Sequence, residues 1–187
     1  MAFCMAKKKS KTSRVATGKT RLVKHAPIKT ITIASEGQVA YASKNKERII
    51  DLLGISSKKE QLSQNDESFF IDLIRKGVPK KGIDRIMDKT GLTEDEMASI
   101  LHISKRTIQR RDPHEALNQE QSERLIEMAR LYSKGEEVLG SIESFKEWMN
   151  RKILTIGDKQ PKQYLDTSIG IGLLLDELGR IQHGVYS

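Results

Sequence analysis

The chain has 187 residues, of which 37% are hydrophobic and 5% aromatic, and its net charge is +8. That length is enough for one or two small domains with a modest core. The single cysteine, Cys4, excludes an internal disulfide and favours a reducing, cytoplasmic location. No run approaches the roughly 18 apolar residues that a membrane span needs, and the start lacks a secretory signal, so we expect no membrane partner.

The basic charge is concentrated in the N-terminal third. Residues 1–60 hold 14 Lys and Arg against 4 Asp and Glu, whereas the remaining 127 residues hold 19 against 21. Residues 1–30 contain no acidic residue, and their like-charge repulsion and few apolar side chains predict a basic, largely disordered arm. Such an arm on a near-neutral body suits a polyanion such as DNA; the alternative is a tail that only keeps the chain soluble.

Residues 31–67 are expected to form a small N-terminal segment and linker. We predict a short strand or hairpin at residues 31–41, around Glu36-Gly37, and a short helix over 44–53 that ends near Gly54. The polar residues that follow, 56–67, indicate a linker.

From residue 68 onward the apolar residues recur at helical spacing, which predicts an all-α body. A first helix should end near Gly77 and Pro79, and a second should end at Gly91. Their apolar faces are Phe69, Phe70, Leu73 and Ile74 in the first helix, and Ile83, Ile86 and Met87 in the second.

Residues 93–111, TEDEMASILHISKRTIQRR, are the most informative segment. Thr93 is placed to cap a short helix, and Glu96, three residues later, to complete a capping box. Ser104 can cap the next helix, Lys105–Arg111, which must end before Pro113 because proline disfavours helix in the residue that precedes it. Two short helices joined by a tight turn predict a helix-turn-helix domain, for which we assign residues 68–117.

The second of these helices has a polar, cationic outer face. Such a face suits the major groove of DNA, where Arg reads guanine and Gln reads adenine. The candidate DNA-binding residues are Ser104, Lys105, Arg106, Thr107, Gln109, Arg110 and Arg111. His102 stands at the turn position where glycine is usual and where a positive φ is often needed. The alternative is a plain helical hairpin whose basic face is only solvated.

Residues 118–187 are predicted to form a second, small helical domain. A long helix should begin at Asn118 and close near Gly135, and Ser141 can cap the helix that follows. The core face of that helix carries Phe145, Trp148 and Met149.

The end of the chain adds one more helix. Residues 155–160 indicate a loop, and Pro161 suits a first helical position. The last helix is predicted over residues 168–182, and Gly184 is placed to end it.

No motif marks a catalytic or metal site. The four histidines lie too far apart in sequence for a local metal motif, and one cysteine does not help. Residues 16–20, Ala-Thr-Gly-Lys-Thr, end like a phosphate-binding loop but lack its first glycine and the strand that should precede it. We therefore predict that the chain is not an enzyme and uses no cofactor or metal.

Residues 68–187 resemble the Xre/MbcA/ParS family of antitoxins in the order and spacing of their residues. One part of the resemblance is Leu92 together with the segment 93–111 described above. The other residues that carry it are Ser122-Glu123-Arg124-Leu125, Glu137-Val138, Gly140, Trp148, Pro161, Leu165-Asp166-Thr167, Gly170, Leu178, Arg180-Ile181 and His183-Gly184. Residues 1–67 fall outside the resemblance.

The resemblance implies a type II toxin–antitoxin pair, in which the partner is a toxin with a RES domain that consumes NAD. Such antitoxins usually form homodimers and typically repress their own operon by binding operator DNA. Their C-terminal domain, often with the extreme C-terminus, covers the active site of the toxin.

The candidate toxin-binding residues are Asp176, Arg180, His183, Val185, Tyr186 and Ser187. Tyr186 offers an aromatic anchor with a polar tip, of the kind favoured in interfaces. The alternative is that Tyr186 folds back on the last helix and contacts no partner. The alternative function is a stand-alone helix-turn-helix regulator whose C-terminal helices only dimerise. A third, weaker alternative is an adaptor that no longer binds DNA.

Overall fold

The computed structural model describes residues 36–56 and 66–184, and of residues 36–44 and 66 it describes only the backbone. The predicted basic arm at 1–30, most of the predicted linker and the candidate residues 185–187 therefore lie outside the described residues.

The described residues form helices joined by short connections, which confirms the all-α fold class. The elements are α1 (Glu36–Leu53), α3 (Asp66–Lys76), α4 (Lys81–Thr90), α5 (Glu94–Ile100), α6 (Lys105–Arg110), α7 (Gln119–Leu139), α8 (Ile142–Asn150), α9 (Ser168–Gln182) and the short 3₁₀ turns η1 (Leu154–Ile156) and η2 (Pro161–Tyr164). No helix in the described part of the chain is both long and apolar enough to cross a membrane.

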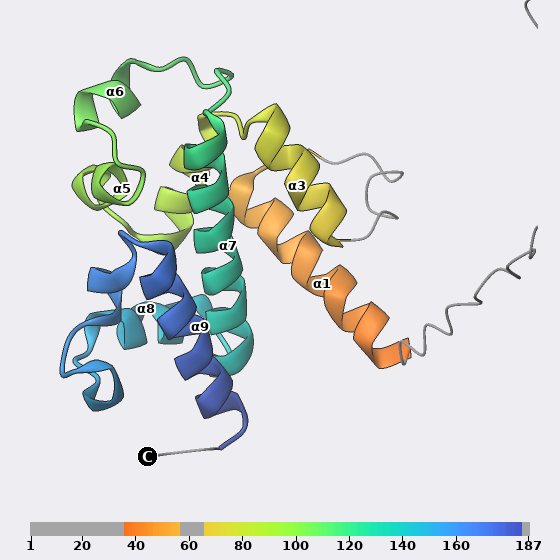
Figure 1. Ribbon diagram of the computed structural model, residues 1–187, viewed down its shortest axis with the longest axis vertical. Helices are drawn as coiled ribbons and strands as arrows, with labels where there is room; N and C mark the ends of the chain where they lie inside the picture. The colour runs from red at the N-terminus through yellow and green to blue at the C-terminus, as the bar shows by residue number, and fades with distance from the viewer. Residues whose placement is uncertain (1–35, 57–65, 185–187) are drawn as a thin grey trace, which may run out of the picture. The chain divides into compact units, whose positions relative to one another are not determined.

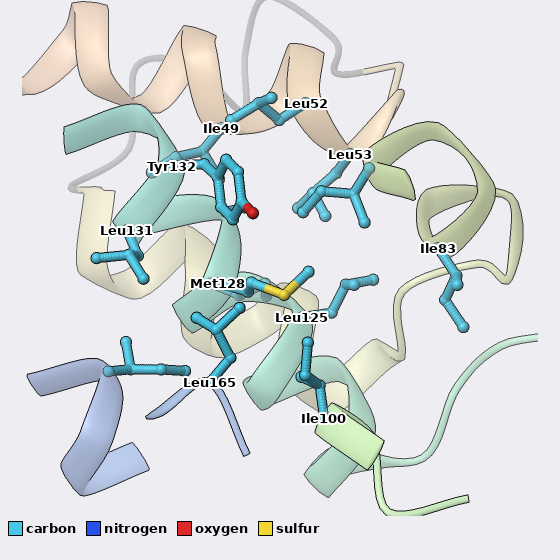
Figure 2. Packing of buried hydrophobic residues seen from close by; sticks show 14 of the residues in the cluster. Ile49, Leu52, Leu53, Ile83, Ile100, Leu125, Met128, Leu131, Tyr132 and Leu165 are labelled. Atoms are coloured by element: carbon cyan, nitrogen blue, oxygen red, sulfur yellow. The ribbon is translucent and has the colours of Figure 1, made fainter. Parts of the chain in front are cut away.

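The long helix α7 organises this fold. It lies between α1 and α3 on one side and α8 and α9 on the other (Figure 1). Leu125, Met128 and Tyr132 of α7 are almost fully buried, and Figure 2 shows them among α1 side chains, including Leu53, and Leu165. Fully burying a side chain of this size contributes about 1.5–3 kcal/mol, so these residues of α7 contribute substantially to core stability. Burial also raises the pKa of the Tyr132 hydroxyl, which stays protonated.

The strand or hairpin predicted at residues 31–41 is wrong for residues 36–41, which belong to α1. A strand needs a hydrogen-bonded partner strand, and the described part of the chain offers none. A helix satisfies its own backbone groups. Burial of Ile49, Leu52 and Leu53 against the core then stabilises α1 as a whole.

The end predicted for the long helix at Gly135 is also wrong, because α7 continues to Leu139. Gly140 ends it with φ 88°, a left-handed conformation that glycine adopts without strain. Gly135 lies inside the helix at a close approach to α8. A Cβ built on Gly135 would lie 2.2 Å from a ring carbon of Phe145. Glycine therefore stands here for packing and not for termination.

The predicted helix starts are confirmed. Asn118 and Ser141 cap α7 and α8 by accepting hydrogen bonds from backbone N–H groups three residues on. The last helix has the predicted bounds, and Gly184 follows it with φ 68°.

Candidate functional site

Residues 93–110 form a helix-turn-helix whose ends are set by local hydrogen bonds. The Thr93 hydroxyl accepts from the backbone N–H of Glu96, and the Glu96 carboxylate accepts from that of Thr93 at 2.9 Å, which completes the predicted capping box. In the turn, His102 has φ 54°, as the glycine-like position requires. Ser104 caps α6 by accepting from the backbone N–H of Thr107 at 3.0 Å. The prediction for this segment is therefore confirmed, with α6 ending at Arg110.

The second helix, α6, has only six residues and one buried side chain, Ile108. Ile108 belongs to the same buried cluster as Met97 and Leu101. So short a helix has little stability of its own, and its position depends on the turn and on α5. The orientation of the outer face of α6 is therefore set by the turn and by α5, and hardly by α6 itself.

The structure divides the candidate DNA-binding residues into two groups. Lys105 donates to Asp95 at 3.1 Å, and Gln109 donates to Glu94 at 2.8 Å. The hydrogen bond to Asp95 and its negative charge raise the pKa of Lys105, with Glu94 adding to the effect. These two side chains are thus held by the acidic first turn of α5.

Arg111 is likewise occupied, because it donates to Gln121 at 2.7 Å and pairs with Glu115 at 3.5 Å. Thr107 is half-buried and hydrogen-bonded to Ser104.

Arg106 and Arg110 form the second group. Both are exposed, and no hydrogen bond or ion pair joins either one to another described residue. They stand four residues apart on α6 and therefore lie on the same face. Two like charges at this spacing disfavour an isolated helix, and an anion bound between them would remove that cost. This pair is the part of the candidate set best placed to meet a phosphate or a base edge.

The candidate toxin-binding residues that the structure describes lie on the outer face of α9. Asp176 and His183 are exposed. Arg180 is half-buried and pairs with the buried Glu177, which also accepts from the Thr155 hydroxyl at 2.6 Å. Asp176 and Arg180 are one helical turn apart, and His183 follows at the C-cap, so the three share one face.

Ile169, which is not among the residues predicted from the sequence, lies seven residues before Asp176 on that same face. Its side chain is 88% exposed, although neighbouring apolar residues Ile171 and Leu174 are buried. Gly172 and Gly179 widen the face, because a Cβ on either would meet no atom within 4 Å. The signal was present in the sequence: Ile169 is out of phase with the large apolar side chains that α9 buries, which recur at positions 171, 174 and 178.

Within the described residues, no cluster of His, Cys, Asp and Glu is arranged to hold a metal ion.

Two family models match the parts of the chain that contain the outer faces of α6 and α9. Residues 69–130 match the antitoxin Xre-like helix-turn-helix domain. Residues 134–184 match the antitoxin Xre/MbcA/ParS C-terminal toxin-binding domain. The chain belongs to the Xre/MbcA/ParS family of antitoxins.

Two curated proteins are similar to this chain over part of its length. A protein named antitoxin Xre from Yersinia enterocolitica (serotype O:8, biotype 1B) is 28% identical over 119 residues, which are 63% of this chain and 80% of that protein. A second antitoxin Xre, from Photorhabdus laumondii subsp. laumondii, is 25% identical over 117 residues, covering 62% of this chain and 79% of that protein.

The two family matches meet within α7 of this antitoxin-family chain, which packs against elements on both sides. Neither match includes α1, although α1 packs on α7 and on α4. The helix-turn-helix face on α6 lies in the first match, and the face on α9 lies in the second.

Proposed function

We propose that this protein is an antitoxin that neutralises a RES-domain toxin through its C-terminal domain and represses its own operon through the helix-turn-helix. The observation that carries the proposal is the match of residues 134–184 to a toxin-binding domain, together with the exposed α9 face inside that match. The RES identity of the toxin, which would consume NAD, rests on the resemblance of residues 68–187 to the family.

The outer face of α9 is the proposed toxin interface. It combines an exposed apolar side chain, Ile169, with the charged residues Asp176 and Arg180 and with His183. An apolar centre with a polar surround is the usual anatomy of a specific protein interface. The last three residues, Val185, Tyr186 and Ser187, follow this face directly in sequence and would extend it into the NAD pocket of the toxin.

Co-expression with the neighbouring reading frame tests the antitoxin function. We expect that frame to arrest growth alone and to be harmless together with this chain. In that assay Ile169→Asp should lose neutralisation, because a charge would have to be buried in the interface. Glu147→Gln, an exposed change on α8, is the control. Residues 185–187 are proposed to block the active site of the toxin. Their removal should therefore abolish neutralisation while toxin binding remains, and neutralisation that survives the removal would refute this role.

A growth arrest that this chain does not relieve would contradict the antitoxin proposal. If operator binding remained, the alternative of a stand-alone regulator that dimerises through its C-terminal helices would replace it.

The proposed DNA contact is made by α6. Arg106 and Arg110 lie free on its outer face, whereas Lys105 and Gln109 must first leave their α5 partners. In the homodimer expected for this family, two such helices would meet two half-sites of an operator. The N-terminal basic residues Lys7–Lys29 would add phosphate contacts that depend on salt.

Fluorescence anisotropy with a duplex from the region upstream of the gene tests this contact. Arg106→Ala should weaken binding by about 1–3 kcal/mol and relax preference at one base pair, if the side chain reads a base. Arg151→Ala, an exposed arginine of the C-terminal domain, is the matched control. An equal loss on every DNA sequence would refute base reading by Arg106 and leave a phosphate contact.

A further inference from the structure

Two side chains from different parts of the chain donate to one backbone oxygen. The carbonyl of Asp166 accepts from His102 Nε2 at 2.9 Å and from Arg124 Nη1 at 2.9 Å. His102 lies in the turn of the helix-turn-helix, Arg124 lies on α7, and Asp166 lies between η2 and α9. A carbonyl oxygen has two lone pairs, so these two donors use its full capacity. We call this arrangement the Asp166 clasp.

The backbone of His102 shows that the turn alone does not explain this residue. At φ 54° a side chain with a Cβ is strained relative to glycine. Glycine would make the same turn without strain. What glycine cannot do is reach Asp166, 64 residues further along the chain. The imidazole therefore does something that the turn geometry does not require.

Arg124 donates to the same carbonyl oxygen of Asp166. Its side chain is only 16% exposed, and its Nε is buried without a hydrogen-bond partner among the described residues. The nearest carboxylate oxygen, on Glu120, is 3.9 Å from that Nε, which is too long for a hydrogen bond. Among the described residues, the hydrogen bond from Nη1 to Asp166 is therefore the one that fixes this partly buried guanidinium.

An ion pair next to the Asp166 clasp also joins the helix-turn-helix to the segment before α9. Lys162 of η2 lies 3.5 Å from Glu96 of α5, the residue that completes the capping box. A pocket of about 140 Å³ lies beside this pair, and its lining includes Glu96, Lys162, Ile100 and Leu165. The C-terminal domain thus touches both α5 and the turn, the two elements on which the position of α6 depends.

We propose that the Asp166 clasp positions the DNA-reading helix: His102 and Arg124 are positioning residues that hold the turn before α6 against the C-terminal domain. This inference rests on the proposed DNA contact of α6. It makes operator affinity depend on the segment that immediately precedes α9, the helix that carries the proposed toxin interface.

The test compares His102→Gly and His102→Asn with the wild type in the full chain. Both residues tolerate a positive φ, and neither reaches Asp166 as histidine does. We expect both variants to bind the upstream duplex about fivefold more weakly, the size of one net hydrogen bond. For His102→Gly, thermal unfolding should occur at the same temperature as in the wild type or higher, because glycine relieves the strain of the turn. His114→Ala removes an exposed imidazole that makes no hydrogen bond or ion pair with a described residue, and it should bind as the wild type does.

Amide hydrogen exchange at Thr107 and Ile108 gives a readout that needs no DNA. These N–H groups bond to Ser104 at the start of α6, and they should exchange about fivefold faster in His102→Gly and in Arg124→Met, by the same hydrogen-bond estimate. Unchanged exchange at both amides overturns the clasp. If the wild type itself binds no duplex, the proposed DNA function fails, and the exchange measurement still decides whether the clasp positions α6.

Discussion

Replacing Gly135 by alanine tests the packing of α7 on α8. In an ordinary helix interior this change would stabilise the protein by about 1 kcal/mol, because alanine has the higher helix propensity. Here the new Cβ would lie 2.2–2.4 Å from three ring carbons of Phe145. Carbon atoms in contact are normally about 3.5–4.0 Å apart, so the ring must move by more than 1 Å.

The surroundings of Phe145 oppose that movement. The ring is fully buried, lies edge-on to Tyr132 at 5.0 Å and is stacked on Trp148 at 5.6 Å. Overpacking of this kind costs about 1–3 kcal/mol, and we place this site at the upper end because a ring held on two sides cannot rotate away. Subtracting the helix gain leaves a net loss of about 2 kcal/mol.

Urea unfolding followed by circular dichroism at 222 nm measures this loss. The midpoint should fall at an unchanged slope, and the Tm should drop by about 4–8 °C for a unit of this size. Gly179→Ala is the matched control, because it is also a helix-interior glycine but its Cβ would meet no atom within 4 Å. We expect Gly179→Ala to gain about 0.5–1 kcal/mol. A Gly135→Ala protein as stable as the wild type would refute the reasoning.

Three further predictions concern helix ends. Ser104→Ala should destabilise the protein by about 1 kcal/mol in the same urea assay, because it removes the cap of α6; an unchanged midpoint would show that this cap contributes nothing. Gly77→Ala should be more damaging than Gly91→Ala, since both have positive φ but only the Cβ on Gly77 would meet a backbone oxygen, at 2.5 Å; equal effects would contradict the steric argument. Partial burial raises the pKa of Glu96, but the bonds from Thr93 and the charge of Lys162 outweigh it, so the net pKa is lowered. The carboxylate therefore stabilises the fold above its ordinary pKa near 4.5, and this contribution is lost as the pH falls through the lowered value. Glu96→Gln should thus lose less than about 1 kcal/mol near neutral pH and nothing in acid, and a difference that grows in acid would reverse this sign.

The accuracy of the sequence predictions follows the range of the interactions involved. The caps at Thr93 and Ser104 and the bounds of α9 were predicted correctly, because a cap is made by groups within three residues of one another. The positive φ of His102 was expected for the same reason, since the turn between two closely packed helices dictates it.

Contacts between residues far apart in the chain could not be predicted from the sequence. Nothing in the residues around Gly135 shows that an aromatic ring from α8 fills the space of its missing side chain. In the same way, composition alone marks every cation on α6 as a DNA contact, whereas the fold holds Lys105 on Asp95 and leaves Arg106 exposed.

From the sequence alone, most of the helices from residue 68 onward, their N-caps and the family could be predicted, because these depend on neighbouring residues and on the order of motifs. The tertiary structure decided which side chains remain free to meet a partner and how the turn at His102 joins the C-terminal domain at Asp166. The physical reason is that hydrogen bonds and van der Waals contacts act over a few ångströms, and only the folded chain brings residues 64 positions apart within that distance.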